Sequence, residues 1–230
     1  MQHQFYSTQE IAGIIGGQLF GTDADRRVSD LLIDSRHLMD PRCALFFALK
    51  SNRNDGHKYI EELYEKGVRA FVISSLPDKT YQEATFILVN DTLKALQSLA
   101  SHHRQQFSFP VIGITGSNGK TIVKEWLYQM LSPDLNIVRS PKSYNSQVGV
   151  PLSVWQMNDS YDLGIFEAGI SEPDEMMALQ NVIRPTLGVF TNIGQAHEEN
   201  FINHAQKAGE KLNLFTKAEK LVYCMDYSDI

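Results

Sequence analysis

Cysteine is scarce in this sequence, which contains only Cys43 and Cys224. Two thiols so far apart give neither a disulfide framework nor the paired spacing of a zinc site, so we expect free cysteines in a reducing compartment. No secretory hydrophobic segment opens the chain, and no apolar run reaches the 18 or so residues that a membrane-spanning helix needs. The sequence therefore predicts a cytoplasmic protein that makes no use of a membrane.

A surplus of basic residues is also missing. The chain has 21 lysines and arginines against 27 aspartates and glutamates, which gives a formal net charge of −6. A general nucleic-acid surface is normally basic, so we expect no nucleic-acid partner. Local binding of a phosphorylated small molecule is not excluded, because a loop can hold phosphate with its own backbone. With 230 residues, 43% of them hydrophobic, the chain can form one large globular domain or two modest ones.

Residues 1–108 are predicted to form a small α/β unit. Ser7 and Glu10 have the spacing of a capping box, which predicts a helix at 8–15 that ends at Gly16. Apolar runs and helical periodicity further predict strands at 28–33, 45–49, 70–73 and 86–89, and helices at 57–66 and 93–106. The break at 108–110, Ser-Phe-Pro, marks the expected domain boundary.

Residues 109–230 alternate between strand and helix patterns. Strands are predicted at 110–112, 137–138, 163–166, 187–191 and 221–224, and helices at 122–131, 172–181 and 205–215. Such alternation predicts a parallel sheet with helices on both faces. The expected fold class is therefore α/β: a small N-terminal unit followed by a parallel-sheet domain. In such sheets, ligands bind beyond the carboxyl ends of the strands.

A glycine-rich stretch follows the first strand of this second region. Residues 113–121 are Gly-Ile-Thr-Gly-Ser-Asn-Gly-Lys-Thr and lead into the helical pattern. Strand, glycine loop and helix form the context of a phosphate-binding loop, in which backbone N–H groups and the helix N-terminus surround the phosphates. Lys120 can then reach the β- and γ-phosphates, and the Thr121 hydroxyl can bind Mg²⁺. Because Ile114 stands where the strict motif has its first glycine, a turn without a ligand stays an alternative.

Polar side chains also fall at the carboxyl ends of two later predicted strands. Glu167 follows one of them, and Asn192 and His197 follow the next. Because the carboxyl ends of parallel strands meet at one edge of a sheet, we expect these residues to converge on the glycine loop. A carboxylate at the end of a buried strand needs a cationic partner, which favours a ligand role for Glu167. His197 stands beside two glutamates, so an exposed loop histidine is the alternative there.

Seven stretches together carry a family resemblance. They are Asp-Ser-Arg at 34–36, Leu-Phe-Phe-Ala-Leu at 45–49, Asn-Asp-Gly-His at 54–57, the loop at 115–121, a segment ending in Gly-Val-Pro-Leu at 144–152, Phe-Glu-Ala-Gly at 166–169 and Asn-Ile-Gly-Gln-Ala-His at 192–197. In this order they resemble the Mur ligases, the amide-forming enzymes of peptidoglycan precursor synthesis. Folylpolyglutamate synthases share the loop style, so the loop alone does not name a substrate. The resemblance covers nearly the whole chain and is greatest to the MurF group.

This resemblance implies a ligase that depends on ATP and Mg²⁺. Members transfer the γ-phosphate of ATP to a substrate carboxylate, and an amine then attacks the acyl phosphate. In the MurF group the carboxylate belongs to UDP-MurNAc-tripeptide and the amine to D-alanyl-D-alanine. Two anions must approach each other in the first step, so cations have to screen both.

The resemblance also implies roles for individual residues. ATP is expected on Thr115, Gly116, Ser117, Asn118, Gly119, Lys120, Thr121 and Asn145. Mg²⁺ is expected on Thr121, Glu167, His197 and Lys211, and catalytic roles are implied for Lys120, His197 and Lys211. Lys211 matches the lysine that the family carbamylates, a change that offers a hard cation an anionic oxygen. Without the family, Lys211 would be expected on a solvated helix face, and Lys207 lies close by in the sequence.

In the first region, the resemblance implies binding of the UDP-sugar by Ser35, Arg36 and His57. Arginine suits the geometry of a diphosphate. Ser35 and Arg36 could instead cap and pair at the end of a strand, and His57 could cap its own helix.

Family members continue beyond the length of this chain into a C-terminal domain. We therefore expect a fragment of a longer ligase that is inactive by itself, and a fusion to an alanine racemase domain is one expectation for the full-length protein. Two alternatives stay open: a ligase of the MurE type, which adds the third peptide residue, and a non-catalytic UDP-sugar or ATP-binding module.

Overall fold

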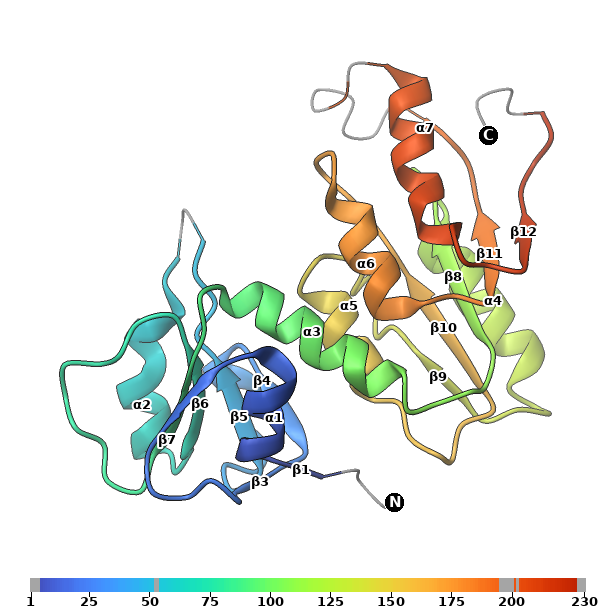
Figure 1. Cartoon of the computed structure of the whole chain (residues 1–230). Helices are drawn as coiled ribbons and strands as arrows, with labels where there is room; N and C mark the ends of the chain where they lie inside the picture. The colour runs from blue at the N-terminus through green and yellow to red at the C-terminus, as the bar shows by residue number, and fades with distance from the viewer. Residues whose placement is uncertain (1–4, 52–53, 195–200, 202, 227–230) are drawn as a thin grey trace. The chain divides into compact units, whose positions relative to one another are not determined.

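The computed structural model describes residues 5–51, 54–194, 201 and 203–226, which form two compact units, Met1–Leu99 and Ala100–Ile230 (Figure 1). The division falls inside helix α3 (Thr92–Arg104), earlier than the boundary predicted at 108–109. The last turn of α3 packs on the second unit: Ser101 Oγ donates to Asn181 O at 2.8 Å, and Arg104 Nε donates to Ile183 O at 2.9 Å. The helix that follows the first sheet therefore already belongs in part to the second core.

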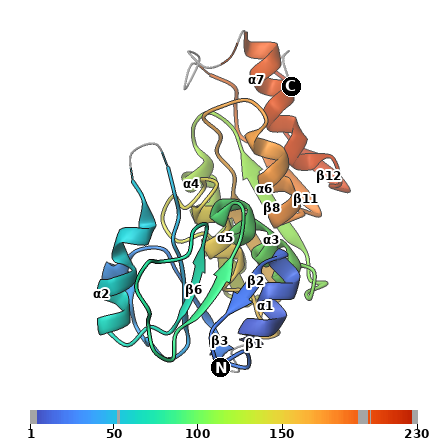
Figure 2. The same cartoon turned by 60° about the vertical axis from the view of Figure 1, so that its left-hand side comes forward.

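The first unit is built on a five-stranded sheet in the order β2-β7-β6-β5-β4. Figure 2 shows this unit from a second side, with β2 and β6 labelled. Its strands are β2 (Gln18–Phe20), β4 (Asp30–Leu32), β5 (Ala44–Phe47), β6 (Ala70–Ile73) and β7 (Thr85–Leu88). The strands β4 to β7 pair in parallel, and β2 runs antiparallel to β7 at one edge. All residues of β5 and β6 are buried, as expected for parallel strands covered on both faces. A further antiparallel pair joins β1 (Tyr6–Ser7) to β3 (Arg27–Val28).

The helices of this unit are α1 (Thr8–Ile15) and α2 (Ile60–Glu65), with 3₁₀ turns at Ser35–His37 and Gly56–Tyr59. The prediction of a capped helix at 8–15 is confirmed. Ser7 accepts from Glu10 N, the Glu10 carboxylate accepts from Ser7 N, and Gly16 ends the helix at φ 63°. Because this left-handed conformation costs glycine little, the helix ends there and the chain turns into β2.

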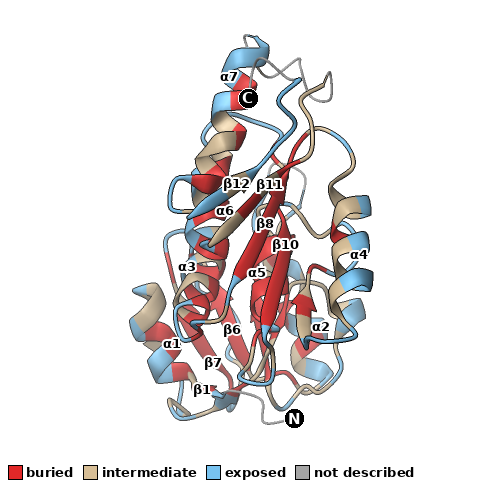
Figure 3. Ribbon diagram, turned by 90° about the vertical axis from the view of Figure 1, so that its right-hand side faces the viewer, coloured by how far each residue is buried: buried red, intermediate tan, exposed pale blue. Residues whose placement is uncertain are grey.

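The second unit contains a five-stranded, fully parallel sheet in the order β12-β11-β8-β10-β9. Its strands are β8 (Val111–Thr115), β9 (Ile137–Arg139), β10 (Leu163–Glu167), β11 (Leu187–Phe190) and β12 (Lys220–Val222). Every residue of the central strands β8 and β10 is buried, whereas β12 at the edge is largely exposed (Figure 3). The alternation of strands and helices in the sequence correctly predicted this parallel sheet.

Helices cover both faces of this sheet. They are α4 (Lys120–Leu131), α5 (Gly149–Val154), α6 (Glu175–Ile183) and α7 (His204–Leu212), followed by a 3₁₀ turn at Asn213–Phe215. Residues of α4 pack on Ile112, Ile114 and Ile165, and residues of α5 and α6 pack in a separate cluster around Phe166 and Phe190. In Figure 3, α4 lies on one side of this sheet and α6 on the other. Within the described part of the chain, no helix is long and apolar enough to span a membrane.

The register of the parallel strands brings three connections to one edge of the sheet. Glu167 in β10 pairs with Ile114 in β8, and Phe190 in β11 pairs with Thr115. The loop after β8, the chain after β10 and the chain after β11 therefore leave the sheet side by side. This is the edge at which open parallel sheets bind ligands.

Candidate functional site

The glycine loop is the first element of this edge. Strand β8 ends at Thr115 and helix α4 begins at Lys120, so residues 116–119 form the connection. Gly116 and Gly119 have φ of 142° and 79°, values that side chains rarely tolerate. A Cβ atom at Gly116 would also lie 3.0 Å from Asn192 N, so glycine is required there for close packing as well.

The start of α4 is open to a ligand. Gly119 provides no side-chain cap, and the first helical hydrogen bond runs from Val123 N to Gly119 O. The N–H groups of the first turn therefore have no partner within the helix, which is the condition under which a helix N-terminus binds phosphate.

The chain after β11 holds the loop in place. Asn192 accepts from two loop N–H groups, from Ser117 N to its backbone oxygen at 2.9 Å and from Asn118 N to its side-chain oxygen at 3.0 Å. Gly194 N donates to Ser117 Oγ at 2.9 Å, and Thr191 Oγ1 donates to Asn118 O. Asn192 thus fixes the loop through two hydrogen bonds, a role that the sequence did not suggest.

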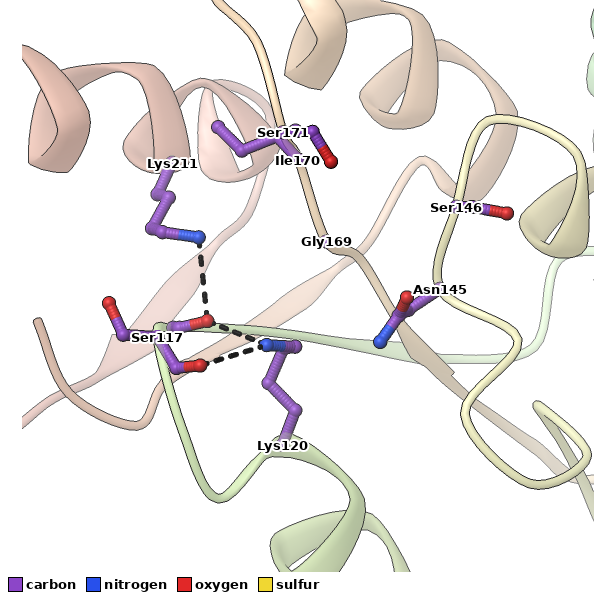
Figure 4. Close-up of a pocket in the computed structure, with 9 residues that line it drawn as sticks. Ser117, Lys120, Asn145, Ser146, Gly169, Ile170, Ser171 and Lys211 are labelled. Atoms are coloured by element: carbon purple, nitrogen blue, oxygen red, sulfur yellow. Dashed lines mark hydrogen bonds between the residues drawn. The ribbon is translucent and has the colours of Figure 1, made fainter. Parts of the chain in front are cut away.

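Two lysines converge on this loop, and a third contacts the chain after β11 that holds it. Lys120 Nζ donates to Gly116 O at 2.8 Å, and Lys211 Nζ reaches the same oxygen at 3.4 Å (Figure 4). The buried Lys207 donates to Gly194 O. Burial, and then the charges of Lys120 and Lys207, lower the pKa of Lys211 to about 7. Burial also lowers the pKa of Lys120, against the opposite effect of Glu167. The crowded positive charge favours an anionic ligand.

Glu167 ends strand β10 beneath the loop, with a fully buried side chain. Its Oε2 accepts from Thr121 Oγ1 at 3.0 Å and from Asn145 Nδ2 at 3.5 Å. Its Oε1 lies 2.9 Å from Lys124 Nζ, yet among the described residues this buried oxygen accepts no hydrogen bond of good geometry. The carboxylate therefore retains oxygen lone pairs that a cation could use.

The glycine loop, Lys120, Lys211 and Asn145 border a cavity of about 120 Å³. Its lining consists of Gly116, Ser117, Lys120, Asn145, Ser146, Gly169, Ile170, Ser171 and Lys211, as Figure 4 shows. Five of these residues were predicted from the sequence for ATP or metal binding, while Ser146, Gly169, Ile170 and Ser171 were not. Gly169 follows Phe-Glu-Ala in a motif that the sequence did reveal, and a Cβ atom there would lie 3.1 Å from Asn145 Oδ1.

The residues present fit a magnesium ion. Mg²⁺ is commonly bound through one or two carboxylates together with substrate phosphates and water. Glu167 and the Thr121 hydroxyl meet at the end of the loop and can supply such a partial shell. The predicted ligand His197 lies outside the described residues, and in the described part of the chain no group of three or more His, Cys, Asp or Glu side chains could hold a metal. The metal assignments stay predictions.

The first unit has a separate cavity of about 410 Å³, lined by Ile33, Asp34, Ser35, Arg36, Asn54 and Tyr59. Arg36 is largely exposed and forms a fork with Asp34, with Nε 2.9 Å from Oδ1 and Nη2 2.5 Å from Oδ2. The Arg36 guanidinium holds the pKa of the Asp34 carboxyl far below its usual range. A diphosphate at this cavity would have to share Arg36 with Asp34.

His57 does not line this cavity, and both of its ring nitrogens have partners. Nε2 accepts from Ser74 N–H at 3.0 Å, so Nδ1 carries the proton and donates to Asp55 Oδ1 at 2.6 Å. The alternative was that His57 caps its own helix, but the side chain that caps this turn is that of Asp55, which accepts from His57 N. A substrate contact by His57 remains a prediction.

Comparisons with known proteins agree with this organisation. Residues 114–228 match the family described as "Mur ligase middle domain", and residues 27–104 match "Mur ligase family, catalytic domain". The chain is 32% identical over 225 residues to the UDP-N-acetylmuramoyl-tripeptide–D-alanyl-D-alanine ligase of Bacillus subtilis, covering 96% of this chain and 49% of that protein. The chain thus spans about half the length of this relative.

Solved structures show the same fold. MurF from Acinetobacter baumannii superposes with a TM-score of 0.86 at 24% identity, over 95% of this chain and 48% of that one. MurF ligase from Thermotoga maritima in complex with ADP superposes with a TM-score of 0.76 at 27% identity, over 87% of this chain and 46% of that one.

Proposed function

Because the chain belongs to the Mur ligase family, we propose that it is the N-terminal and central part of an ATP-dependent ligase. The whole protein would join D-alanyl-D-alanine to UDP-MurNAc-tripeptide, the two substrates in the name of the Bacillus subtilis relative. The joining would proceed through an acyl phosphate. The second unit would hold ATP, and the first would hold the UDP-sugar at the cavity beside Ser35 and Arg36. We place this reaction in the cytoplasm, where ATP and UDP-sugars are found.

The cavity above the glycine loop is the observation that carries this proposal. It lies beside the start of α4 and is lined by Lys120 and Lys211. A phosphate group bound there would be close to the backbone N–H groups of the helix start and to two lysine side chains. The Thermotoga maritima relative was solved in complex with ADP, which supports binding of an adenine nucleotide. Lys120 would stabilise the negative charge of the β- and γ-phosphates while the substrate carboxylate attacks the γ-phosphorus. Asn145 would orient the transferred group.

Mg²⁺, when bound, would screen the negative charge of the γ-phosphate and polarise it. Thr121 and Glu167 would hold it, since their side chains meet below the cavity. His197 and a carbamylated Lys211 would complete the ligands near the acyl group.

Two alternatives are weaker. A ligase of the MurE type would share the loop and Glu167, but the relatives quoted above are all MurF ligases. A non-catalytic module would have no need for a buried carboxylate, a threonine hydroxyl and crowded lysines at one edge. For these 230 residues alone, nucleotide binding without turnover is the expectation. A fused alanine racemase stays a prediction, since both family matches describe Mur ligase domains.

A ligation assay on the full-length protein that contains this chain tests the proposal. ATP, Mg²⁺, UDP-MurNAc-tripeptide and D-alanyl-D-alanine should yield UDP-MurNAc-pentapeptide and inorganic phosphate, detected by mass spectrometry and phosphate release. Phosphate release only with UDP-MurNAc-dipeptide and a diamino acid would favour the MurE type. Tight binding of ATP or UDP-sugar without any product would favour the module.

Lys211 is expected to carry a carbamate. Carbon dioxide reacts with an uncharged amine, and an ordinary lysine with a pKa near 10.4 is uncharged in only about one molecule in 2,500 at pH 7. The pKa of about 7 leaves Lys211 uncharged in about half of the molecules at that pH. With ¹³C-bicarbonate at pH 8, NMR should show a carbamate signal that fades as the pH falls below 7.

Lys211→Arg should remove this signal, and the matched control Lys207→Arg should retain it. Loss of the signal in Lys207→Arg alone would move the modification to the neighbouring lysine. No signal in the wild type would contradict the assignment.

A further inference from the structure

Lys124 is a fully buried lysine that the proposed mechanism does not use. It lies one turn beyond Lys120 on α4, and none of its side chain is exposed to solvent. A lysine on a surface helix normally extends its ammonium group into water. At Lys124 the ammonium instead points into the protein, below the glycine loop.

Four oxygen atoms lie close to this ammonium group. Lys124 Nζ donates to Ser140 O at 2.8 Å and to Lys142 O, and it lies 2.9 Å from Glu167 Oε1. Glu125 Oε1 lies further away, at 3.3 Å. The three nearest acceptors come from the loop after β9 and from the end of β10, so one side chain of α4 joins three elements.

These three elements carry the groups proposed to bind Mg²⁺ and ATP. Helix α4 carries Thr121, β10 carries Glu167, and the loop after β9 continues to Asn145. Ser140, whose carbonyl accepts from Lys124, also accepts from Glu167 N–H through its hydroxyl at 3.2 Å. The position of the Glu167 carboxylate is thus fixed from both its backbone and its Oε1 side.

Stability alone is a poor explanation for this arrangement. A buried ion pair must lose the hydration of both charges, and an apolar pair of similar volume is often as stable or more stable. What the pair does provide is orientation. With Oε1 directed to Lys124, the other oxygen, Oε2, faces the Thr121 hydroxyl at 3.0 Å.

We propose that Lys124 is a positioning residue: it holds Glu167 Oε1 so that Oε2 is presented beside Thr121 to the divalent cation of the bound nucleotide, and it fixes the 140–145 loop around the same place. This inference rests on the proposed nucleotide function. It extends that function by naming a buried cation, distinct from Lys120, that acts through a carboxylate and never touches the nucleotide.

The test compares nucleotide binding with and without metal. Isothermal titration with ADP is performed in MgCl₂ and in EDTA, and Mn²⁺ affinity of the ADP complex is measured by electron paramagnetic resonance. Lys124→Met keeps the length of the side chain and removes its charge, and Lys124→Gln retains one donor in case the first variant fails to fold. Glu125→Gln is the local control, because it alters a neighbour of the same ammonium group and leaves the pair with Glu167 intact.

Loss of an outer partner of a metal ligand commonly weakens metal affinity by about 10–100-fold. We expect this weakening for Mn²⁺ in a folded Lys124 variant, while its ADP affinity in EDTA and the metal affinity of Glu125→Gln stay within about threefold of the wild type. Unchanged metal affinity in the variant would overturn the proposal. The proposal would also be overturned if ADP affinity fell equally in MgCl₂ and in EDTA, or if both Lys124 variants failed to fold. Either result would mean that Lys124 has only a structural role. A wild type without metal-dependent ADP binding would instead overturn the proposed function.

Discussion

Replacing Lys120 with alanine is expected to lower the rate of ligation by the full-length protein by about 10²–10³-fold, the usual loss for one preorganised group that stabilises transition-state charge. Among the described residues, the Lys120 ammonium donates to the carbonyl oxygens of Gly116 and Ser117 in the loop. Burial lowers the pKa of Lys120, and Glu167 only partly opposes this, so its charge is held at the site at some cost to the fold. Removing it should therefore leave the fold intact.

The measurement is kcat with saturating ATP, together with the melting temperature of each variant. Lys217→Ala is the matched control, because Lys217 is an exposed lysine of the same unit, outside the cavity above the loop. Its kcat should equal that of the wild type. A Lys120→Ala protein that melts normally and turns over at the wild-type rate would remove Lys120 from the phosphate site.

The parts of the fold that were predictable are those in which local sequence and burial agree. The residues of β8 and β10 are buried throughout, so they appear in the sequence as apolar runs between turn signals. Helix α1 has both of its capping groups within the sequence that forms it. Strand β2 was missed because it is short and partly exposed, and its antiparallel pairing with β7 joins residues far apart in the chain.

Boundaries that depend on tertiary packing were predicted less well. The strand predicted at 28–33 is two strands, β3 and β4, because Ser29 and Asp30 both donate to Cys43 O where the pairing changes partner. The helix predicted at 57–66 begins as a 3₁₀ turn, which Asp55 caps by accepting from His57 N. Helix α6 begins at Glu175, later than the predicted residue 172, after Asp174 adopts φ 66°.

The residues of the candidate site also fall into two groups, those with a local signal in the sequence and those without one. The glycine loop and Glu167 could be found because a phosphate cradle and a carboxylate at a strand end have local signals. Lys124 could not be found, since its partners are the carbonyl of Ser140 and the carboxylate of Glu167, both distant in sequence. Lys211 was named through the family resemblance alone. Only the folded chain shows that it is buried beside the loop.

The largest stability effect is expected from Glu167→Ala. This substitution leaves the Lys124 ammonium buried with two carbonyl partners and only the partly exposed carboxylate of Glu125, at 3.3 Å, among the described residues. Removing one partner of a buried ion pair typically lowers the free energy of unfolding by about 3–5 kcal/mol. Urea unfolding of the wild type and the variant measures this difference, with Glu219→Ala as the control because Glu219 is exposed on the same unit.

The double variant Lys124→Met/Glu167→Leu separates stability from function. Both charges are gone and the volume is roughly kept, so the free energy of unfolding should return to within about 1–2 kcal/mol of the wild type, because apolar replacements of buried ion pairs are often neutral. Metal-dependent ADP binding should not return, since the carboxylate beside Thr121 is absent. A Glu167→Ala protein as stable as the wild type would show that breaking the Lys124–Glu167 pair does not lower the free energy of unfolding. Recovery of metal-dependent binding in the double variant would show that the cation is held elsewhere at this edge.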